Sequence, residues 1–358
     1  MPTSAGRREF LKRAGIGVAS AMCASGCLRL ACADTAPNTA WLQANLPQLA
    51  ERSLRELCVP GTHDAGMSVS LPGTAFACAC NTQTQSIGIL GQLLHGARYF
   101  DIRPVISAGQ YTTGHYTAIA VSGLTTWQGA NGQTIDSIVA DVNAYTATHS
   151  ELVVLYLSHD LDTDLGNSAY APFTQQQWND LLTRLLQGLN HRFVHDSASD
   201  LTMLPLQTFI GTGQAAVIVV VDPSANGINL GSYAGQGFYP ASSFPVYNQY
   251  ADTNDASKMI SDQFAKLAAQ RPDPAASYFL LSWTLTQTTL QAATCAVGLA
   301  PSILQMASSV NALLPMRLLS ACTPQSYPNV LYVDGISDFP DLVTLAMQIN
   351  GLSRSSRR

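Results

Sequence analysis

The sequence is organised around the segment Cys58-Val-Pro-Gly-Thr-His-Asp-Ala-Gly66. The apolar residues 57–59 predict a short buried strand, and the pair Pro60-Gly61 is expected to end it. His63 and Asp64 would then lie side by side just beyond the strand. In an α/β barrel the catalytic residues lie at the carboxyl ends of the strands, so adjacent ionisable side chains at this point indicate a function. The alternative is a turn with a solvated aspartate and an incidental histidine.

Two later motifs extend this pattern. The segment Ala97-Arg-Tyr-Phe-Asp-Ile-Arg103 predicts a second strand, and Gly114-His115 follows about a dozen residues later. Together the motifs resemble the bacterial branch of the phosphatidylinositol-specific phospholipase C X-domain superfamily. That family has a Pro-Gly-Thr-His-Asp turn, a helix ending in Gln-Leu-x-x-Gly, an Arg-Tyr-Phe-Asp-Ile-Arg strand and a second histidine. The matching segments, which cover roughly residues 55–120, are Pro60–Asp64, Gln92–Gly96, Arg98–Arg103 and His115.

The resemblance implies a fold, a reaction and a set of roles. The fold is an α/β, irregular, incompletely closed TIM-type barrel. The reaction is a phospholipase C-type cleavage of phosphatidylinositol-type lipids, in which the inositol 2-hydroxyl attacks the phosphate and diacylglycerol and cyclic inositol phosphate are formed. His63 would be the general base, and His115 would be the general acid toward the diacylglycerol oxygen. Asp64 would assist that acid, Arg103 would bind the phosphate and Asp101 would hold the network together.

The residue types suit this chemistry. Internal attack on a phosphodiester needs a base, a cation for the phosphoryl oxygens and an acid for the leaving oxygen. Two imidazoles and a guanidinium suffice, because an unperturbed histidine can act as base or acid near neutral pH. A buried aspartate commonly orients such a base, and Asp334, at the end of the last predicted strand, is the candidate by position. The alternative is that these residues are structural: Arg98 and Asp101 would form an ion pair, and His115 would be a hydrogen-bonded histidine of a loop.

Arg103 also determines the expected cofactor. In the calcium-dependent eukaryotic enzymes, as the family pattern goes, an acidic metal ligand takes this place and an asparagine follows the first histidine. Here a guanidinium stands where the charge of the metal would be, and Asp64 follows His63. A guanidinium supplies a fixed positive charge and a fork of donors. The sequence therefore predicts no metal, with calcium as the alternative.

Four more residues are candidates for substrate binding: His159, Asp222, Tyr247 and Tyr250. His159 and Asp222 each follow an apolar strand on the expected catalytic face, and a solvated loop is the alternative for the histidine. The tyrosines belong to the segment 235–250, whose aromatic rings could stack under an inositol ring, meet lipid or simply pack. Clear equivalents of the basic inositol-phosphate contacts of the bacterial enzymes are missing, which leaves the headgroup open.

The rest of the chain alternates between apolar strands and helix-sized segments, which favours parallel βα units. About seven strands are expected in all. The later strands are predicted at 151–158, 215–221, 278–285 and 330–334, and the helices at 137–148, 174–189, 254–270, 301–319 (interrupted by Pro315) and 340–349.

Residues 1–33 read as a targeting segment. Gly6-Arg-Arg-Glu-Phe-Leu-Lys12 is close to a twin-arginine export motif, and Ala31-Cys-Ala33 fits a signal-peptidase site. The apolar run between them is too short to span a bilayer, and a faint lipoprotein box at 24–27 lacks the usual leucine. We therefore expect export to the periplasm or the extracellular space, a single barrel domain over 34–350 and a basic tail at 351–358.

Charge and composition limit the partners. Removal of residues 1–33 would take away five basic residues and one acidic residue and shift the formal net charge from −5 to −9. This balance argues against nucleic acid and against strong attraction to anionic membranes. The expected partner is the headgroup of a phospholipid or glycolipid, reached by transient contact of a monomer with a membrane surface.

Five cysteines follow the targeting segment, so at least one thiol is free if the others pair. Cys295–Cys322 is the predicted bridge, and Cys58 with Cys78 or Cys80 is a second candidate. A zinc site is disfavoured, because the spacing between Cys78 and Cys80 is too tight and no histidine pair follows.

Two alternative functions remain. A different phosphodiesterase on a similar barrel, such as a glycerophosphodiesterase or a sphingomyelinase D-like lyase, would need clustered acidic metal ligands that the motifs lack. A non-catalytic module that binds lipid headgroups would be expected to lack one of His63, Arg103 and His115, and all three are present.

Overall fold

The computed structural model describes residues 39–121, 124–196, 199–339 and 341–351, which all belong to one compact unit. The predicted targeting segment and residues 352–358 of the predicted tail lie outside the described residues. None of the described helices combines the length and the apolarity that a bilayer span requires.

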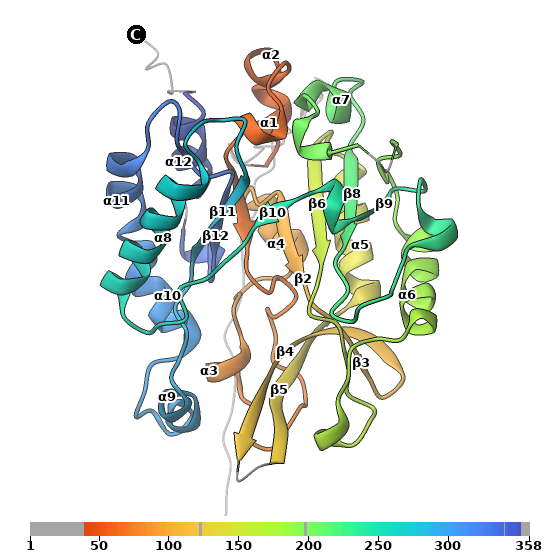
Figure 1. Cartoon of the computed structure of the whole chain (residues 1–358), viewed down its shortest axis with the longest axis vertical. Helices are drawn as coiled ribbons and strands as arrows, with labels where there is room; N and C mark the ends of the chain where they lie inside the picture. Colours follow the sequence, from red (N-terminus) through yellow and green to blue (C-terminus); the bar gives the residue numbers. More distant parts are fainter. Residues whose placement is uncertain (1–38, 122–123, 197–198, 340, 352–358) are drawn as a thin grey trace, which may run out of the picture. The chain divides into compact units, whose positions relative to one another are not determined.

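An eight-stranded parallel sheet forms the centre of this unit (Figure 1). Its strand order is β10-β11-β12-β1-β2-β6-β8-β9, so β9 and β10 form its two edges and the barrel is incompletely closed. The predicted α/β fold, an irregular TIM-type barrel, is confirmed. The strands are β1 (Val59–Thr62), β2 (Tyr99–Ile102), β6 (Leu152–Leu157), β8 (Ala216–Val221), β9 (Phe238–Pro240), β10 (Val246–Tyr247), β11 (Tyr278–Trp283) and β12 (Val330–Val333).

Two apolar layers pack against this sheet. Alternate residues of β8, such as Val219, face a layer shared with the surrounding helices, while the residues between them, such as Ile218, face the barrel interior. Both faces of the parallel strands are therefore buried, which explains why their sequences are continuous apolar runs. The main surrounding helices are α4 (Ile89–Leu94), α5 (Ile135–Thr146), α6 (Gln175–Gly188), α8 (Ala256–Gln270), α10 (Ile303–Asn311), α11 (Leu314–Ala321) and α12 (Leu342–Ile349).

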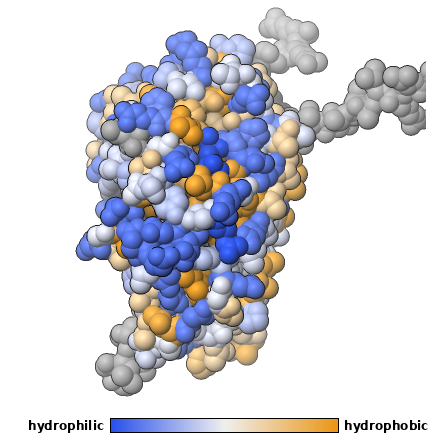
Figure 2. All heavy atoms as spheres, turned by 90° about the vertical axis from the view of Figure 1, so that its right-hand side faces the viewer, coloured by the Kyte–Doolittle hydropathy of each residue, from blue (hydrophilic) through white to orange (hydrophobic). Residues whose placement is uncertain are grey.

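Helix α6 shows how the sequence determines one of these elements. The Thr174 hydroxyl accepts a hydrogen bond from the backbone N–H of Gln177, whose own side chain returns to Thr174 and completes a capping box. Trp178, Leu181 and Leu185 lie on one buried face. On the face of the molecule that contains α6 and β9, hydrophilic side chains cover much of the surface (Figure 2).

A second, four-stranded sheet was not expected from the sequence. It has the order β5-β4-β3-β7 and includes a long antiparallel hairpin in a stretch where no strand was predicted. The glycines permit close approach in this hairpin: a Cβ at Gly129 would lie 2.1 Å from the carbonyl oxygen of His115. The strands are β3 (Pro104–Ser107), β4 (Gln110–Val121), β5 (Leu124–Thr134) and β7 (Leu161–Asp162).

Two predicted element boundaries are wrong. Pro60 and Gly61 lie inside β1 instead of ending it, because the strand continues between β2 and β12 and a Cβ at Gly61 would lie 2.5 Å from a methyl carbon of Val330. The break between α10 and α11 precedes Pro315, which lies in the first turn of α11, where a proline removes no intrahelical hydrogen bond.

The predicted disulfides are also wrong. The bond joins Cys80 to Cys295, whereas Cys58, Cys78 and Cys322 are free thiols. Cys322 lines a groove with residues that precede β1 and β12, at the amino end of the barrel strands. Cys295 lies instead in the connection that follows β11, at their carboxyl end, so the barrel separates the two residues.

Candidate active site

The candidate residues converge at the carboxyl ends of the barrel strands. His63 and Asp64 follow β1, Arg103 follows β2, and Asp334 follows β12. His115 arrives from β4, in the second sheet. Asp64 has a backbone φ of 40°, a left-handed conformation that is costly for a residue with a side chain and that occurs often at functional sites.

The first histidine is held by a buried carboxylate. His63 Nδ1 lies 2.7 Å from Asp334 Oδ1, and the Asp334 residue is only 1% exposed. Burial disfavours the charged imidazole most strongly, but the charge and hydrogen bond of Asp334, together with the charge of Asp101, raise the pKa of His63 above its ordinary value. With Nδ1 bonded to Asp334, the opposite ring nitrogen is left for a substrate.

The second histidine has a similar arrangement. His115 Nδ1 lies 2.7 Å from Asp64 Oδ2, and Asp64 is fully buried. The rings of His63 and His115 are nearly perpendicular, with centroids 6.3 Å apart. Two imidazoles, each with its own carboxylate, therefore face the same small space.

Arg103 contacts two of the buried carboxylates of the cluster, those of Asp101 and Asp64. Its Nε donates to Asp101 Oδ2 at 3.0 Å, and one terminal nitrogen lies 3.7 Å from Asp64 Oδ2. Burial opposes the charge of the guanidinium, but the two carboxylates raise the pKa of Arg103 well above its usual range. The side chain is therefore a permanent cation at the centre of the site.

Asp101 is the most connected carboxylate of the cluster. It accepts hydrogen bonds from the hydroxyl of Tyr332 at 2.5 Å and from the backbone N–H of Asp64 at 3.1 Å, in addition to that of Arg103. Burial alone would raise the pKa of Asp101, but Arg103, and then His159 and His63, hold it well below its usual range. The predicted alternative, an Arg98–Asp101 ion pair, is wrong: Arg98 pairs with the buried Glu151.

His159 adds a third imidazole close to this cluster. It is exposed, has a left-handed φ of 57°, and its Nδ1 lies 2.7 Å from the Ser158 hydroxyl. The charge of Arg103 lowers the pKa of His159, so its neutral form is favoured. The adjacent Asp160 is buried and accepts from two backbone N–H groups, those of Phe173 and Ser224, and is therefore structural.

The other substrate-binding candidates divide into two groups. Asp222 and Tyr247 line a cavity of about 590 Å³ together with Tyr156, whose hydroxyl donates to Asp222 at 3.2 Å. Tyr156 is also the cross-strand partner of Asp101. Arg55 and Ser277, which line the same cavity, precede β1 and β11 and so lie at the amino ends of these strands. Tyr250 does not line this cavity and is 58% exposed.

Comparisons with known proteins identify the architecture. The sequence matches no protein-family model and no curated protein. Structures of phosphatidylinositol-specific phospholipase C from Staphylococcus aureus match with TM-scores of 0.56 and 0.55 at 16% identity, over 83% and 81% of this chain and 95% and 93% of theirs. The enzyme from Listeria monocytogenes matches with a TM-score of 0.51 at 11% identity, over 84% of this chain and 95% of its own.

The protein shares the fold of these phospholipases. At such identities the likeness concerns the fold alone.

Several polar residues that support the histidine cluster were not recognised from the sequence. The Gln85 amide nitrogen donates to the carbonyl oxygens of His63 and Val333, at 3.1 and 3.0 Å, and its oxygen accepts from the N–H of Ile336. It thereby ties the ends of β1 and β12 together. Thr84 donates to the carbonyl oxygen of Asp64.

Asn311 and Tyr332 complete this supporting set. Asn311 donates to the backbone carbonyl of Asp334 at 2.8 Å. Only Tyr332 carried a recognisable signal, because it precedes Asp334 by two residues on a predicted strand and so projects to the same face.

Proposed function

We propose that the protein is a phospholipase C-type phosphodiesterase that cleaves phosphatidylinositol-type lipids through attack of the inositol 2-hydroxyl. The observation that carries the proposal is the pairing of His63 and His115 with separate buried carboxylates around one guanidinium, that of Arg103. The shared barrel fold adds support at the level of architecture.

His63 is the general base in this mechanism. Its Nδ1 proton is held by Asp334, so Nε2 has a free lone pair for the 2-hydroxyl proton. As the proton moves to Nε2, the imidazolium that forms is stabilised by the Asp334 carboxylate. The deprotonated oxygen attacks phosphorus, and the bond from phosphorus to the diacylglycerol oxygen breaks.

Arg103 and His115 act on the other atoms of the phosphate. The guanidinium of Arg103 donates to the phosphoryl oxygens, where negative charge accumulates during attack. His115 delivers a proton to the leaving diacylglycerol oxygen, and Asp64 holds that ring in place through Nδ1. The products are a diacylglycerol and a cyclic inositol phosphate, and the two histidines have exchanged their protonation states.

We propose that the reaction needs no metal. The cluster fits calcium poorly, because the bonded oxygens of Asp64 and Asp101 already serve His115, Arg103 and Tyr332. Asp64 Oδ1 is buried and has no partner in the described residues, but calcium takes about six to eight oxygen ligands. The guanidinium supplies the positive charge instead.

The polar residues beside the cluster favour a headgroup without additional phosphates. His159 is biased toward its neutral form, and Asp222 offers a carboxylate, whereas Arg55, a cation that lines the same cavity, is already paired with Asp200. A carboxylate beside the cavity accepts hydrogen bonds from sugar hydroxyls and repels phosphate groups. The headgroup of unmodified phosphatidylinositol, or of a glycolipid built on it, meets these requirements.

An exposed apolar rim supports transient contact with a lipid surface. Phe76, Leu290, Val297 and Leu299 are each at least 72% exposed. Phe76 belongs to the loop before α3 (Ala79–Thr82), and the other three belong to residues 289–299, which contain α9 (Thr289–Thr294) and η6 (Cys295–Val297). Both segments lie close to the hairpin that carries His115 (Figure 1). Exposed apolar side chains at such a position suit insertion among lipids. The predicted twin-arginine signal would deliver the enzyme to an exported lipid or to an external membrane.

The test is cleavage of phosphatidylinositol vesicles by the purified protein with excess chelator, followed by phosphorus NMR of the product. Cyclic inositol phosphate is the expected product. Activity that appears only after calcium is restored would overturn the metal-free mechanism. Absence of activity under both conditions would redirect the search to other phosphodiester headgroups.

A further inference from the structure

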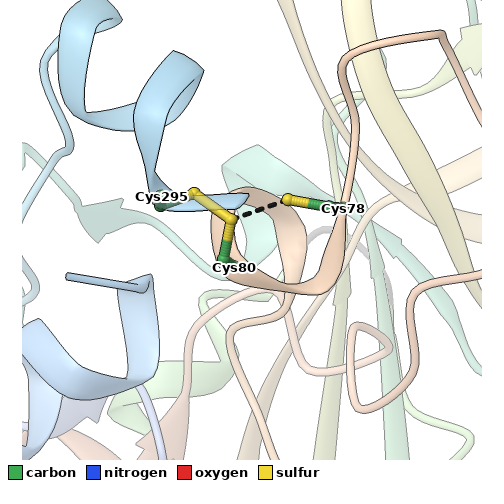
Figure 3. A group of neighbouring side chains, drawn as sticks. All are labelled: Cys78, Cys80 and Cys295. Carbon is green, nitrogen blue, oxygen red and sulfur yellow. Dashed lines mark hydrogen bonds between the residues drawn. A yellow bond between two sulfur atoms is a disulfide. The ribbon is translucent and has the colours of Figure 1, made fainter. Parts of the chain in front are cut away.

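Three cysteines outside the candidate active site converge at one point. Cys80 is bonded to Cys295, and the free thiol of Cys78 lies 2.6 Å from Cys80 Sγ. All three sulfur atoms lie within 4.8 Å of one another. Figure 3 shows that the Cys78 and Cys295 side chains approach Cys80 from opposite sides. A free thiol beside a disulfide, on the side away from the sulfur that would leave, is arranged for exchange.

We propose that these residues form a thiol–disulfide exchange site in which Cys78 attacks Cys80 and releases Cys295. The thiolate of Cys78 forms a bond to Cys80 Sγ, and the Cys80–Cys295 bond breaks. Its electron pair leaves on the sulfur of Cys295, which takes up the proton that Cys78 lost. One disulfide and one thiol are present before and after the step, so no oxidant or reductant is consumed.

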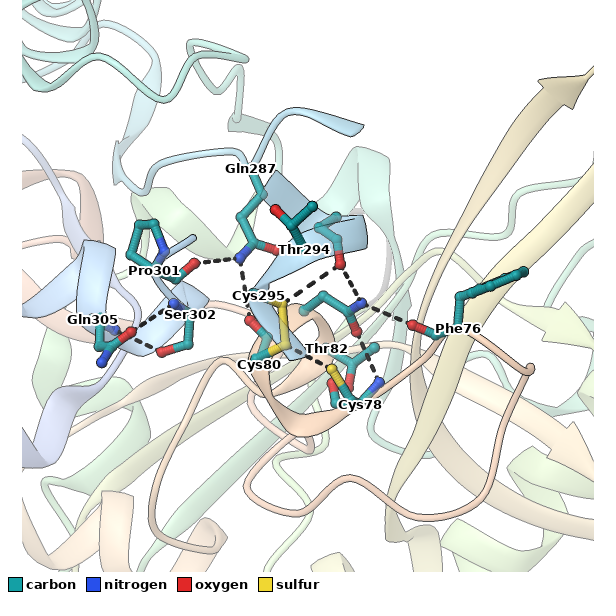
Figure 4. The surroundings of a disulfide bond; sticks show 12 residues. Phe76, Cys78, Cys80, Thr82, Gln287, Thr294, Cys295, Pro301, Ser302 and Gln305 are labelled. Carbon is teal, nitrogen blue, oxygen red and sulfur yellow. Dashed lines mark hydrogen bonds between the residues drawn. A yellow bond between two sulfur atoms is a disulfide. The ribbon is translucent and has the colours of Figure 1, made fainter. Parts of the chain in front are cut away.

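The surrounding hydrogen bonds keep the attacking cysteine in place. The N–H of Cys78 donates to the Asn81 side chain, and the Thr82 hydroxyl donates to the carbonyl oxygen of Cys78. Figure 4 shows Cys78 and Thr82 beside the Cys80–Cys295 bond. Asn81 also donates to the carbonyl oxygen of Ala292 in α9. This contact would keep the two segments adjacent after the disulfide has moved, so that the exchange is reversible.

The thiol–disulfide exchange changes how α9–η6 is attached to the barrel. In the Cys80–Cys295 form, a covalent bond ties this segment to α3. In the Cys78–Cys80 form, the bond lies within the α3 region alone, and α9–η6 keeps only non-covalent contacts. The released segment carries the exposed side chains of Leu290, Val297 and Leu299, so the exchange would alter the mobility of part of the apolar rim.

The same region supports the histidine cluster. Thr84 and Gln85 follow α3 within three residues and hold the backbone of Asp64 and His63. Movement of α3 would therefore reach these two residues through two hydrogen bonds. The inference itself does not depend on the proposed reaction, because its primary readout is the pairing of the cysteines.

The experiment traps the free thiols of the full-length oxidised protein with iodoacetamide, at about pH 7 and about pH 9, without reductant. The protein is then digested with trypsin and the peptides are identified by mass spectrometry. Residues 56–98 contain Cys78 and Cys80, and residues 267–317 contain Cys295, so the two pairings give different linked peptides. We expect alkylated Cys295 together with an internal Cys78–Cys80 bond, in an amount that rises with pH because a thiolate is the attacking species.

Two variants make the result specific. In Cys78→Ser, labelling of Cys295 should fall by at least about tenfold, because the thiol that lies beside the disulfide is removed. In the matched control Cys322→Ser, labelling of Cys295 should equal that of the natural sequence. Cys295 that stays unlabelled at both pH values, or that labels equally in Cys78→Ser, would overturn the proposal.

A second measurement reports the consequence of exchange. Hydrogen–deuterium exchange of residues 289–299 should be faster in the alkylated, Cys78–Cys80 form than in the Cys78→Ser protein, where the original bond is locked. Equal protection in the two proteins would show that the disulfide does not restrain this segment.

Discussion

His63 Nδ1 lies 2.7 Å from Asp334 Oδ1, although the two residues are 271 positions apart in the chain. The contact forms because β1 and β12 are neighbours in the barrel and both residues directly follow their strands. This hydrogen bond joins the residues that follow the first and last strands of the barrel, and it determines the tautomer of His63, the proposed base.

Replacement of Asp334 by asparagine should lower kcat by about 10²- to 10⁴-fold, because an amide that donates to Nδ1 would leave the proton on the nitrogen needed for catalysis. Turnover and thermal unfolding of the variant should be measured together. Asp338→Asn, which changes an exposed carboxylate four residues away, is the matched control and should keep full activity. Unchanged turnover in Asp334→Asn would remove Asp334 from the mechanism.

His63→Ala and His115→Ala should each fold normally and lose nearly all activity, by about 10² to 10⁴ in kcat, because each removes one proton-transfer group. Circular dichroism checks the fold, and the release of diacylglycerol checks the activity. His195, which is half-buried and lies outside the histidine cluster, provides a control substitution to alanine that should leave turnover intact. Near-normal activity in either active-site variant would contradict the two-histidine mechanism.

The pH dependence of kcat/KM should reflect the pKa of His63. The base must be neutral in the free enzyme, and Asp334 raises the pKa of this ring, so activity should fall on the acidic side with an apparent pKa above the ordinary histidine value of about 6.5. Loss of the negative charge in Asp334→Asn should move this limb to lower pH. If the apparent pKa on the acidic side of the profile is the same in Asp334→Asn as in the natural sequence, His63 is not the titrating base.

Gln85→Ala should destabilise the protein by about 1–3 kcal/mol and reduce turnover, because it removes hydrogen bonds to the ends of both β1 and β12 and leaves buried groups unsatisfied. Denaturant unfolding and steady-state kinetics test these two effects. Gln83→Ala removes a bond to the Ser68 carbonyl instead, so it should affect stability without a comparable loss of kcat. Equal kinetic effects in both variants would contradict a positioning role for Gln85.

Cys295→Ser should lower the free energy of unfolding by about 2–5 kcal/mol, because the disulfide closes a long loop of the unfolded chain. Chemical denaturation under non-reducing conditions measures this change. Cys322→Ser, which changes a thiol outside the disulfide, should have a smaller effect. If the free energy of unfolding falls no further in Cys295→Ser than in Cys322→Ser, the disulfide contributes little to stability.

Much of the barrel could be predicted from the sequence because its signals are local. The apolar runs of β6 and β8 and the capped amphipathic pattern of α6 depend on neighbours in the chain, and each appears within two residues of its predicted bounds. The hairpin of β4 and β5 was missed because its glycines and small polar residues show no apolar alternation. Its glycines are required by close backbone contacts that only the folded chain creates.

The sequence by itself determined the parallel βα order and the positions of His63, Asp64 and Arg103 at strand ends, since both follow from local patterns. Asp334 was a candidate partner of His63 by position, and the tertiary structure shows the contact. Only the tertiary structure decided the pairing of Tyr332 with Asp101 and of Cys80 with Cys295. Barrel curvature brings segments together that are hundreds of residues apart. A pairing of this kind depends on where the strands end in space, which no short stretch of sequence encodes.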